Sequence, residues 1–292
     1  MEIIRFIRQF SNPALDWFMR IITQFGDVYF YLAIGIIFYW ILDKKFGFKL
    51  MVAFLFSMTI NGLIKTIVKR PRPFHKDSSL LLHDFDITDG YSFPSGHAQG
   101  IFSMGTILLK EHGRHKWLKY TLITLMILVP ISRVYLAQHY LSDILVGAVI
   151  GVIFSLLGLF LLEYGQDNVE DIRALYLIPL VFILAFVFKD KDIYRAAGAY
   201  TGLAIGYFLE KKYVGYDIND TIKVNILKLL IGVPTVFGLE LGFKALLRLV
   251  GLPNSLVYIV TYFVVTLWAS FGVMAVFKAL FKKKKQLVLK ES

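Results

Sequence analysis

The sequence predicts an all-α fold, a polytopic bundle of about nine transmembrane helices preceded by an N-terminal amphipathic helix in the membrane interface. Of the 292 residues, 57% are hydrophobic and 16% are aromatic, with a mean hydropathy of +0.63. Soluble domains are only about 45–50% apolar. The apolar residues also fall in runs close to the roughly 20 residues that a helix needs to cross a bilayer.

The first segment, residues 1–25, differs from the others because charges interrupt its apolar residues. The apolar side chains follow a helical spacing between Arg5, Arg8, Asp16 and Arg20. The segment lacks the continuous apolar stretch and the small-residue cleavage site of a signal peptide. We therefore expect an amphipathic helix lying in the plane of the membrane.

The remaining apolar runs divide the chain into two regions. A first region of five spans covers residues 26–165, and an additional C-terminal region of about four spans and a basic tail covers residues 166–292. No linker between the runs is long enough for a soluble domain. The predicted spans are 28–42, 48–64, 97–110, 117–136, 144–162, 174–188, 194–209, 226–243 and 255–277.

Glycines recur at every fourth position in three of these spans. This spacing is typical of transmembrane helices whose backbones approach each other closely. We interpret the three stripes as packing surfaces. Their members are Gly147 and Gly151, Gly198, Gly202 and Gly206, and Gly238 and Gly242.

The net charge of +11 is better explained by loops that flank membrane spans than by a nucleic-acid partner, which we do not expect. Lys and Arg are more frequent on the side of the C-terminal tail, which predicts a cytoplasmic C-terminus in a multi-pass plasma-membrane protein. The segments 65–96 and 132–143 then share the extracytoplasmic face. The chain has no cysteine, so disulfides and thiolate chemistry are excluded.

Those two segments, with the start of the third span, contain three unusual motifs. The first, KTIVKRPRP, holds Lys65 and Arg72. The second, PSGH at residues 94–97, stands at the threshold of an apolar run. The third, SRVYLAQHYLSD at residues 132–143, supplies another group of polar side chains in a hydrophobic context.

Five of the residues in these motifs are suited to binding phosphate. Lys65 offers a point charge, whereas Arg72 and Arg133 offer planar guanidinium groups that pair with two oxygens at once. Ser95 is a good N-cap, and Gly96 permits close approach of the backbone, so that their N–H groups at a helix N-terminus can hold a phosphate oxygen. The motifs therefore predict a phosphate cradle.

Three further residues are suited to the chemistry of phosphoryl transfer. His139 and Asp143 are four positions apart, on one face of a helix, and a carboxylate on one ring nitrogen leaves the other nitrogen as a nucleophile. His97, from another segment, is then available as a general acid toward the leaving oxygen. Because protein cations can neutralise the transition state, no metal ion or other cofactor is expected.

The three motifs together resemble those of the type 2 phosphatidic acid phosphatase (PAP2) superfamily, in its integral-membrane branch. The resemblance covers about residues 26–165 and matches every fixed position of the pattern. It implies that His139 forms a phosphohistidine, that Asp143 orients it, and that His97 protonates the departing alcohol and later activates water. It also implies that Lys65, Arg72, Ser95, Gly96 and Arg133 bind the phosphoryl oxygens.

The preferred function is hydrolysis of a phosphorylated lipid taken from the bilayer, with a diacylglycerol, sphingoid or polyprenyl tail and either a monophosphate or a pyrophosphate. A soluble sugar phosphate is an alternative substrate, because membrane glucose-6-phosphatases share the motifs. A transporter or channel with a basic vestibule is an alternative of another class. The tail preference, the oligomeric state and the role of the last four spans stay open.

Other residues give weaker signals. His112 and His115 are interpreted as part of a charged cytoplasmic loop. The segment 74–93, with His75 and His83, is either a solvated loop or a rim of the site. Glu240, within an apolar run, is either functional or paired with Lys244 one turn later.

Overall fold

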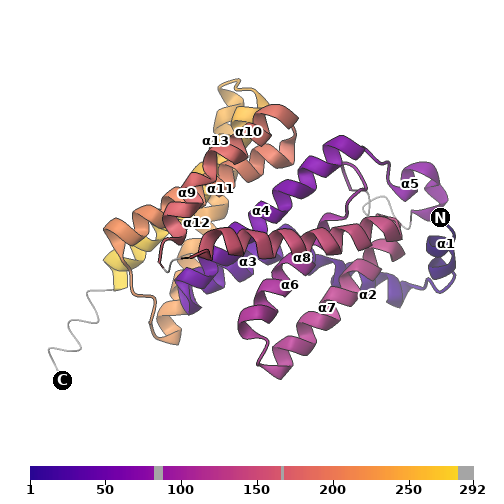
Figure 1. Cartoon of the computed structure of the whole chain (residues 1–292), viewed down its shortest axis with the longest axis horizontal. Coiled ribbons are helices and arrows are strands. Elements are labelled where there is room, and N and C mark those ends of the chain that lie inside the picture. Colours follow the sequence, from indigo (N-terminus) through magenta and orange to yellow (C-terminus); the bar gives the residue numbers. More distant parts are fainter. Residues whose placement is uncertain (82–87, 166–167, 282–292) are drawn as a thin grey trace. The chain divides into compact units, whose positions relative to one another are not determined.

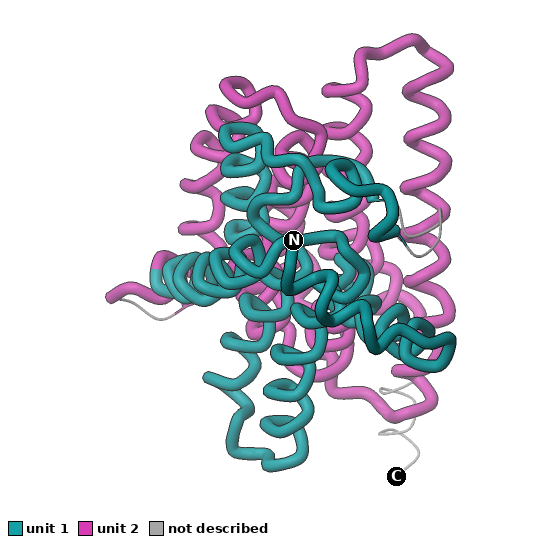
Figure 2. The backbone as a smooth tube through the Cα atoms, turned by 90° about the vertical axis from the view of Figure 1, so that its right-hand side faces the viewer, with its two compact units in different colours: residues 1–33, 56–160 teal, residues 34–55, 161–292 magenta. Residues whose placement is uncertain are grey.

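The structure is a computed structural model that describes residues 1–81, 88–165 and 168–281, and the described residues are almost entirely helical, with no strand. Figure 1 shows the course of the helices, and Figure 2 separates two compact units. Unit 1 comprises residues 1–33 and 56–160, and unit 2 comprises residues 34–55 and 161–292. The expected all-α fold is confirmed.

The helices of the first half of the chain position the three motifs. Short 3₁₀ or π segments (η) lie between some of them. These elements are α1 (Glu2–Arg8), α2 (Pro13–Gln24), α3 (Val28–Ile37), η1 (Phe38–Leu42), α4 (Lys44–Val68), α5 (Pro73–Lys76), η2 (Ser78–Leu80), α6 (Gly96–His112), α7 (Lys116–Tyr135) and α8 (Leu141–Glu163).

The second half of the chain is also helical. Its elements are α9 (Glu170–Tyr176), α10 (Ile178–Phe188), α11 (Lys191–Leu209), η4 (Glu210–Val214), α12 (Ile222–Leu249), α13 (Asn254–Leu267) and η5 (Trp268–Gly272). The basic tail predicted at the C-terminus, residues 282–292, lies outside the described residues.

Each of the nine predicted spans is helical, but not all of these helices are long and apolar enough to cross a membrane. Six helices have the required length and apolar composition, or seven if the bent pair Pro13–Gln24 and Val28–Leu42 forms one span. The predicted span 28–42 belongs to this set only as part of the bent pair, and two further predicted spans are missing from it. The span at α6 has only 17 residues, about 25 Å of helix, and the span at α11 begins with three charged residues among its first five.

The single helix predicted over residues 1–25 is wrong in one respect, because the segment forms two helices. The chain breaks at Asn12, whose side chain accepts a hydrogen bond from the Leu15 N–H at 3.0 Å, and Pro13 begins α2. An N-cap followed by proline at the first helical position is a strong start signal, so it overrides the continuous periodicity. Within unit 1, α2 packs against α7, where Tyr135 donates a hydrogen bond to Asp16.

Two of the three glycine stripes are packing surfaces, as predicted. A Cβ added at Gly147 in α8 would lie 2.7 Å from the Ser95 carbonyl oxygen at the start of α6. A Cβ added at Gly198 in α11 would lie 2.2 Å from the Ile259 carbonyl oxygen in α13. Both distances are far below van der Waals contact, so these helix pairs require glycine at the crossing.

The third stripe was wrongly predicted as a packing surface. A Cβ added at Gly238 or Gly242 in α12 would have no heavy atom within 4 Å among the described residues. Close to them on α12, Glu240 accepts a hydrogen bond from the Tyr262 hydroxyl at 2.9 Å. The four-residue spacing of glycines therefore indicates a possible contact surface, but the presence of a facing helix decides whether it is used.

Unit 2 also contains ion pairs, each with one buried member, that tie its helices together. Lys228, which is fully buried, lies 2.8 Å from Asp220 and donates to the Trp40 carbonyl at 3.0 Å. The Lys44 ammonium lies 2.7 Å from the Glu210 carboxylate. Because each buried charge has an opposite partner, the pairs offset their desolvation and fix the packing of α4, α12 and η4.

Candidate active site

The residues of the three motifs converge within unit 1. Lys65 lies in the last turn of α4 and Arg72 directly before α5, while Arg133 lies in the last turn of α7. All three cations act electrostatically on His139, in the turn between α7 and α8. The same cations and His139 act on His97 in the first turn of α6. Segments far apart in the sequence therefore form one basic centre.

A sharp turn after α7 places His139. Ala137 has a left-handed backbone, with a φ of 54°, and the N–H groups of Gln138 and His139 both donate to the Arg133 carbonyl, at 2.9 and 3.3 Å. The side chain of His139 is 2% exposed. The turn thus attaches the imidazole directly to the end of the helix that carries Arg133.

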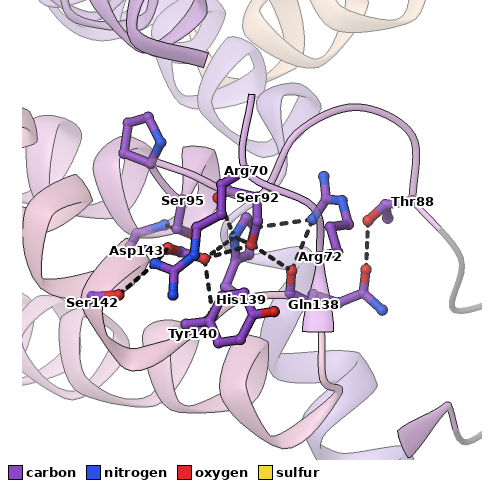
Figure 3. Close-up of polar contacts among 12 residues, drawn as sticks. Arg70, Arg72, Thr88, Ser92, Ser95, Gln138, His139, Tyr140, Ser142 and Asp143 are labelled. Atoms are coloured by element: carbon purple, nitrogen blue, oxygen red, sulfur yellow. Dashed lines mark hydrogen bonds and ion pairs between the residues drawn. The ribbon is translucent and has the colours of Figure 1, made fainter. Parts of the chain in front are cut away.

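The hydrogen bonds of His139 define its tautomer (Figure 3). Its Nδ1 lies 2.7 Å from the Ser92 carbonyl oxygen, and its Nε2 lies 3.2 Å from Nη1 of Arg72. A carbonyl can only accept and a guanidinium can only donate, so Nδ1 carries the proton and Nε2 keeps its lone pair. The imidazole therefore presents Nε2 toward Arg72.

Asp143 is fully buried, and its carboxylate accepts three hydrogen bonds. Nη1 of Arg70 donates to Oδ1 at 2.7 Å, the Tyr140 N–H donates to Oδ2 at 2.9 Å, and the Ser92 hydroxyl also donates to Oδ2. The distance from Oδ2 to Nδ1 of His139 is 3.6 Å. The sequence predicted a direct hydrogen bond between this carboxylate and the imidazole. Nδ1 of His139 bonds instead to the closer Ser92 carbonyl.

Arg72 is 4% exposed and its guanidinium is held by main-chain carbonyls. Nε donates to Gly90 at 3.0 Å, Nη2 to Asp89 at 2.9 Å and Nη1 to Gln138 at 3.1 Å. With the contact to His139, four of the five N–H donors are engaged. The segment that precedes the PSGH motif is therefore part of the site.

The start of α6 differs from the expected cradle in one detail. The Ser95 hydroxyl caps the helix by accepting from the Ala98 N–H at 3.4 Å, as predicted. The Ser95 N–H, expected to face the phosphate, donates instead to the Asp143 carbonyl at 3.0 Å. The Gly96 N–H is at the first helical position, which has no intrahelical acceptor. A Cβ added at Gly96 would lie 3.9 Å from the Lys65 ammonium nitrogen.

Two residues near the N-terminus complete the surroundings. Thr23, at the end of α2, accepts a hydrogen bond from Nη1 of Arg133 at 2.9 Å. A Cβ added at Gly26 would lie 2.8 Å from Cδ2 of His97, so the chain passes directly over this imidazole. The segment between α2 and α3 thus forms one wall of the site.

Burial and charge give His139 its protonation state. Burial in the protein lowers the pKa of this imidazole well below its usual range, and the nearby cations Arg72, Arg133 and Lys65 lower it further. Each of these effects disfavours the imidazolium form. His139 is therefore neutral at pH 7 before an anion enters, as a nitrogen nucleophile must be.

Sequence reasoning missed Arg70 and Ser92. Arg70 pairs with Asp143 and lies over the Tyr140 ring at 3.9 Å. Its main-chain carbonyl accepts a hydrogen bond from the Ser92 N–H. In the sequence, Arg70 could not be distinguished from its basic neighbours in KTIVKRPRP. Ser92 lies two positions before the PSGH motif, and this proximity was the only available signal.

The weaker histidine candidates that the structure describes do not join the centre. His75 packs edge-on against Phe74, with ring centroids 4.3 Å apart, on the short helix α5. His112 and His115 lie at the opposite end of α6, in the connection to α7. His83 lies outside the described residues.

Comparison with known proteins gives the same family over both halves of the chain. Residues 46–167 match the PAP2 superfamily, and residues 194–285 match its family described as PAP2 superfamily phosphatase, transmembrane extension. The first match includes the three motifs. The second falls within the additional C-terminal region and shows that helices after the motifs also have counterparts in the superfamily.

Curated relatives carry phosphatase names. Phosphatidylglycerophosphatase B of Bacillus subtilis is 30% identical, over 54% of this chain and 77% of its own length. Undecaprenyl-diphosphatase of Sulfolobus acidocaldarius is 27% identical, over 54% of this chain and 75% of its own length. Sphingosine-1-phosphate phosphatase 1 of rat is 24% identical over 82% of this chain, which spans 57% of the rat protein. The chain belongs to the PAP2 superfamily of membrane phosphatases.

Proposed function

We propose that this chain is an integral-membrane, metal-independent phosphatase that hydrolyses a phosphorylated lipid through a phosphohistidine on His139. One observation carries the proposal. Nε2 of a neutral, buried imidazole faces Arg72 in the field of two further cations, Arg133 and Lys65. A phosphate drawn in by these charges would meet a nucleophile with its lone pair already oriented.

In the first step, Nε2 of His139 attacks phosphorus while the bond to the lipid oxygen breaks. His97, which takes up a proton as the anionic phosphate binds beside it, donates that proton to the departing oxygen, so the lipid leaves as a neutral alcohol or, from a pyrophosphate, as a monophosphate. The imidazole keeps its Nδ1 proton, which stays hydrogen-bonded to the Ser92 carbonyl. The product is a phosphohistidine and a neutral His97.

In the second step, neutral His97 accepts a proton from water as the water oxygen attacks phosphorus. The bond between phosphorus and Nε2 breaks, inorganic phosphate is released, and His139 and His97 return to their starting protonation states. In both steps Lys65, Arg72, Arg133 and the Gly96 N–H neutralise charge on the phosphoryl oxygens, and Ser95 caps the helix that presents Gly96.

The substrate is proposed to be a lipid because the site is built on the ends of membrane helices and because curated relatives are phosphatases of phospholipid, sphingoid and polyprenyl substrates by name. We propose a catalytic core at residues 26–165, a nine-span bundle and a site on the extracytoplasmic face of the plasma membrane, with the C-terminus in the cytoplasm. The phosphate then meets the cations while the bilayer holds the tail.

The test is phosphate release by the purified protein in lipid nanodiscs. The substrates are phosphatidic acid, phosphatidylglycerophosphate, sphingosine 1-phosphate, undecaprenyl pyrophosphate and glucose 6-phosphate, with His139→Ala as the control. We expect release from at least one lipid by the wild type and none by the variant. Release from glucose 6-phosphate alone would contradict the lipid assignment. No release from any substrate would favour a transporter.

A further inference from the structure

We propose that Ser92 is a positioning residue through which Asp143 orients the nucleophile, so that the carboxylate acts on His139 by way of the serine and not by direct contact. The proposal rests on the proposed function of His139. It names a residue outside the three motifs, and it assigns the carboxylate a different route of action from the one that the motif spacing predicts.

The distances exclude a direct hydrogen bond. Oδ2 of Asp143 is 3.6 Å from Nδ1 of His139, whereas the Ser92 carbonyl oxygen is 2.7 Å from the same nitrogen. Hydrogen bonds between nitrogen and oxygen have lengths of about 2.7–3.2 Å. The single Nδ1 proton is therefore directed at the Ser92 carbonyl oxygen and not at the Asp143 carboxylate.

Ser92 is held through its hydroxyl, its N–H and its carbonyl, which makes the carbonyl a fixed acceptor. Its hydroxyl donates to Oδ2 of Asp143, and its N–H donates to the Arg70 carbonyl at 2.8 Å. The third point is the bond that its carbonyl accepts from His139. Ser92 is fully buried, so water does not compete for these groups.

Asp143 is itself fixed, so the hydroxyl of Ser92 has a rigid anchor. Its other oxygen pairs with Arg70 at 2.7 Å, and the Tyr140 N–H reinforces the oxygen that Ser92 contacts. Arg70 thus contacts this arrangement twice, through its guanidinium on Asp143 and through its carbonyl on Ser92. The route from carboxylate to imidazole runs through Ser92 (Figure 3).

This arrangement predicts how loss of the Ser92 hydroxyl will act. The carbonyl would lose its anchor on Asp143, and the imidazole could rotate or exchange its proton between Nδ1 and Nε2. The cations that bind phosphate would be unchanged. Ser92→Ala should therefore lower kcat about 10- to 100-fold, as loss of an outer hydrogen bond does elsewhere, and change KM little.

The kinetic experiment is a double-mutant cycle on the full-length protein in nanodiscs. It compares wild type, Ser92→Ala, Asp143→Asn and the double variant with the best lipid substrate. If Asp143 acts through Ser92, the alanine substitution should cost no more than about threefold in the asparagine background. A loss in that background as large as in wild type would overturn the proposal, and so would Ser92→Ala with wild-type kcat or with a change in KM alone.

Ser103→Ala is the matched control. Ser103 is fully buried in α6, in the same unit, and its hydroxyl has no hydrogen-bond partner among the described residues. The substitution removes the same atom from a similar environment, so its kcat should equal that of the wild type. A decrease in kcat equal to that of Ser92→Ala would attribute the effect to packing and overturn the positioning role.

A spectroscopic measurement tests the inference without catalysis. In protein labelled with ¹⁵N-histidine in lipid bilayers, His139 is identified by comparison with His139→Gln. The wild type should show a protonated Nδ1 and an unprotonated Nε2, and Ser92→Ala should show a mixture of tautomers. A protonated Nε2 in the wild type, or an unchanged tautomer in Ser92→Ala, would overturn the proposal. An inactive wild type with these predicted signals would instead contradict only the proposed function.

Discussion

Nη1 of Arg72 lies 3.2 Å from Nε2 of His139, so a group expected to bind the phosphate contacts the nitrogen that we propose as the nucleophile. The contact holds the lone pair of Nε2 in a defined direction. In the proposed mechanism this N–H donor passes from the imidazole to the arriving phosphoryl oxygen, which frees the lone pair of Nε2 for attack.

Replacing Arg72 with lysine should impair catalysis although the charge is kept. Lysine cannot reproduce a planar group that donates to three carbonyls and to His139 at once. We expect kcat/KM to fall by about 10²–10³, the usual effect of losing a donor to the transition state. Steady-state kinetics of Arg72→Lys measure this, and a value within threefold of wild type would show that positive charge alone is sufficient.

Acidification should destabilise the fold through His139. Its pKa is lowered in the folded state, so the unfolded state binds more protons as the pH falls below about 6.5. Stability is then fully present above that pH and is lost by up to about 1.4 kcal/mol per pH unit below it. Thermal unfolding at pH 7.5 and 5.5 should show a smaller decrease for His139→Gln than for wild type, and equal decreases would contradict the buried neutral imidazole.

The crossing of α8 and α6 should tolerate no side chain at Gly147. A Cβ there would lie 2.7 Å from the carbonyl of Ser95, the residue that caps α6 and bonds to Asp143. We expect Gly147→Ala to lose about 1–3 kcal/mol of stability and most of its activity. The matched control is Gly238→Ala, where the added Cβ meets no atom within 4 Å. A loss of stability as large in the control would contradict the packing account.

Activity should persist in EDTA and be inhibited by vanadate. In the proposed mechanism Lys65, Arg72 and Arg133 supply the positive charge that metal ions supply in other phosphatases, and vanadate resembles the five-coordinate phosphorus of the transition state. Phosphate release should be unchanged after dialysis against EDTA, and vanadate should compete with the lipid. Loss of activity in EDTA that is restored by a divalent ion would contradict this prediction.

The sequence predicted the members of the site more accurately than the hydrogen bonds among them. The motif spacing and composition were enough to place Lys65, Arg72, Arg133, His97 and His139 in one centre, because each lies at the end of an apolar run on the same predicted face. The helical fold followed from the same runs. These features depend on composition and periodicity, which a single sequence contains.

The remaining features depend on backbone geometry at non-helical positions. Asp143 and His139 share a spacing that suggests direct contact, but the turn at Ala137 moves His139 out of α8, and the Ser92 carbonyl enters between them. The unused stripe at Gly238 depends on whether another helix faces it. Neither the direction of a main-chain carbonyl nor the presence of a facing helix is encoded in the local residue pattern.

The most direct test of the central claim is to trap the phosphoryl group on the protein. Wild-type enzyme is mixed with a ³²P-labelled lipid phosphate, quenched in alkali within milliseconds and digested for peptide mapping. We predict label that is stable to base, labile to acid and attached to His139, with none in His139→Ala. Rapid release of phosphate with no labelled protein, or label on any other residue, would contradict the account.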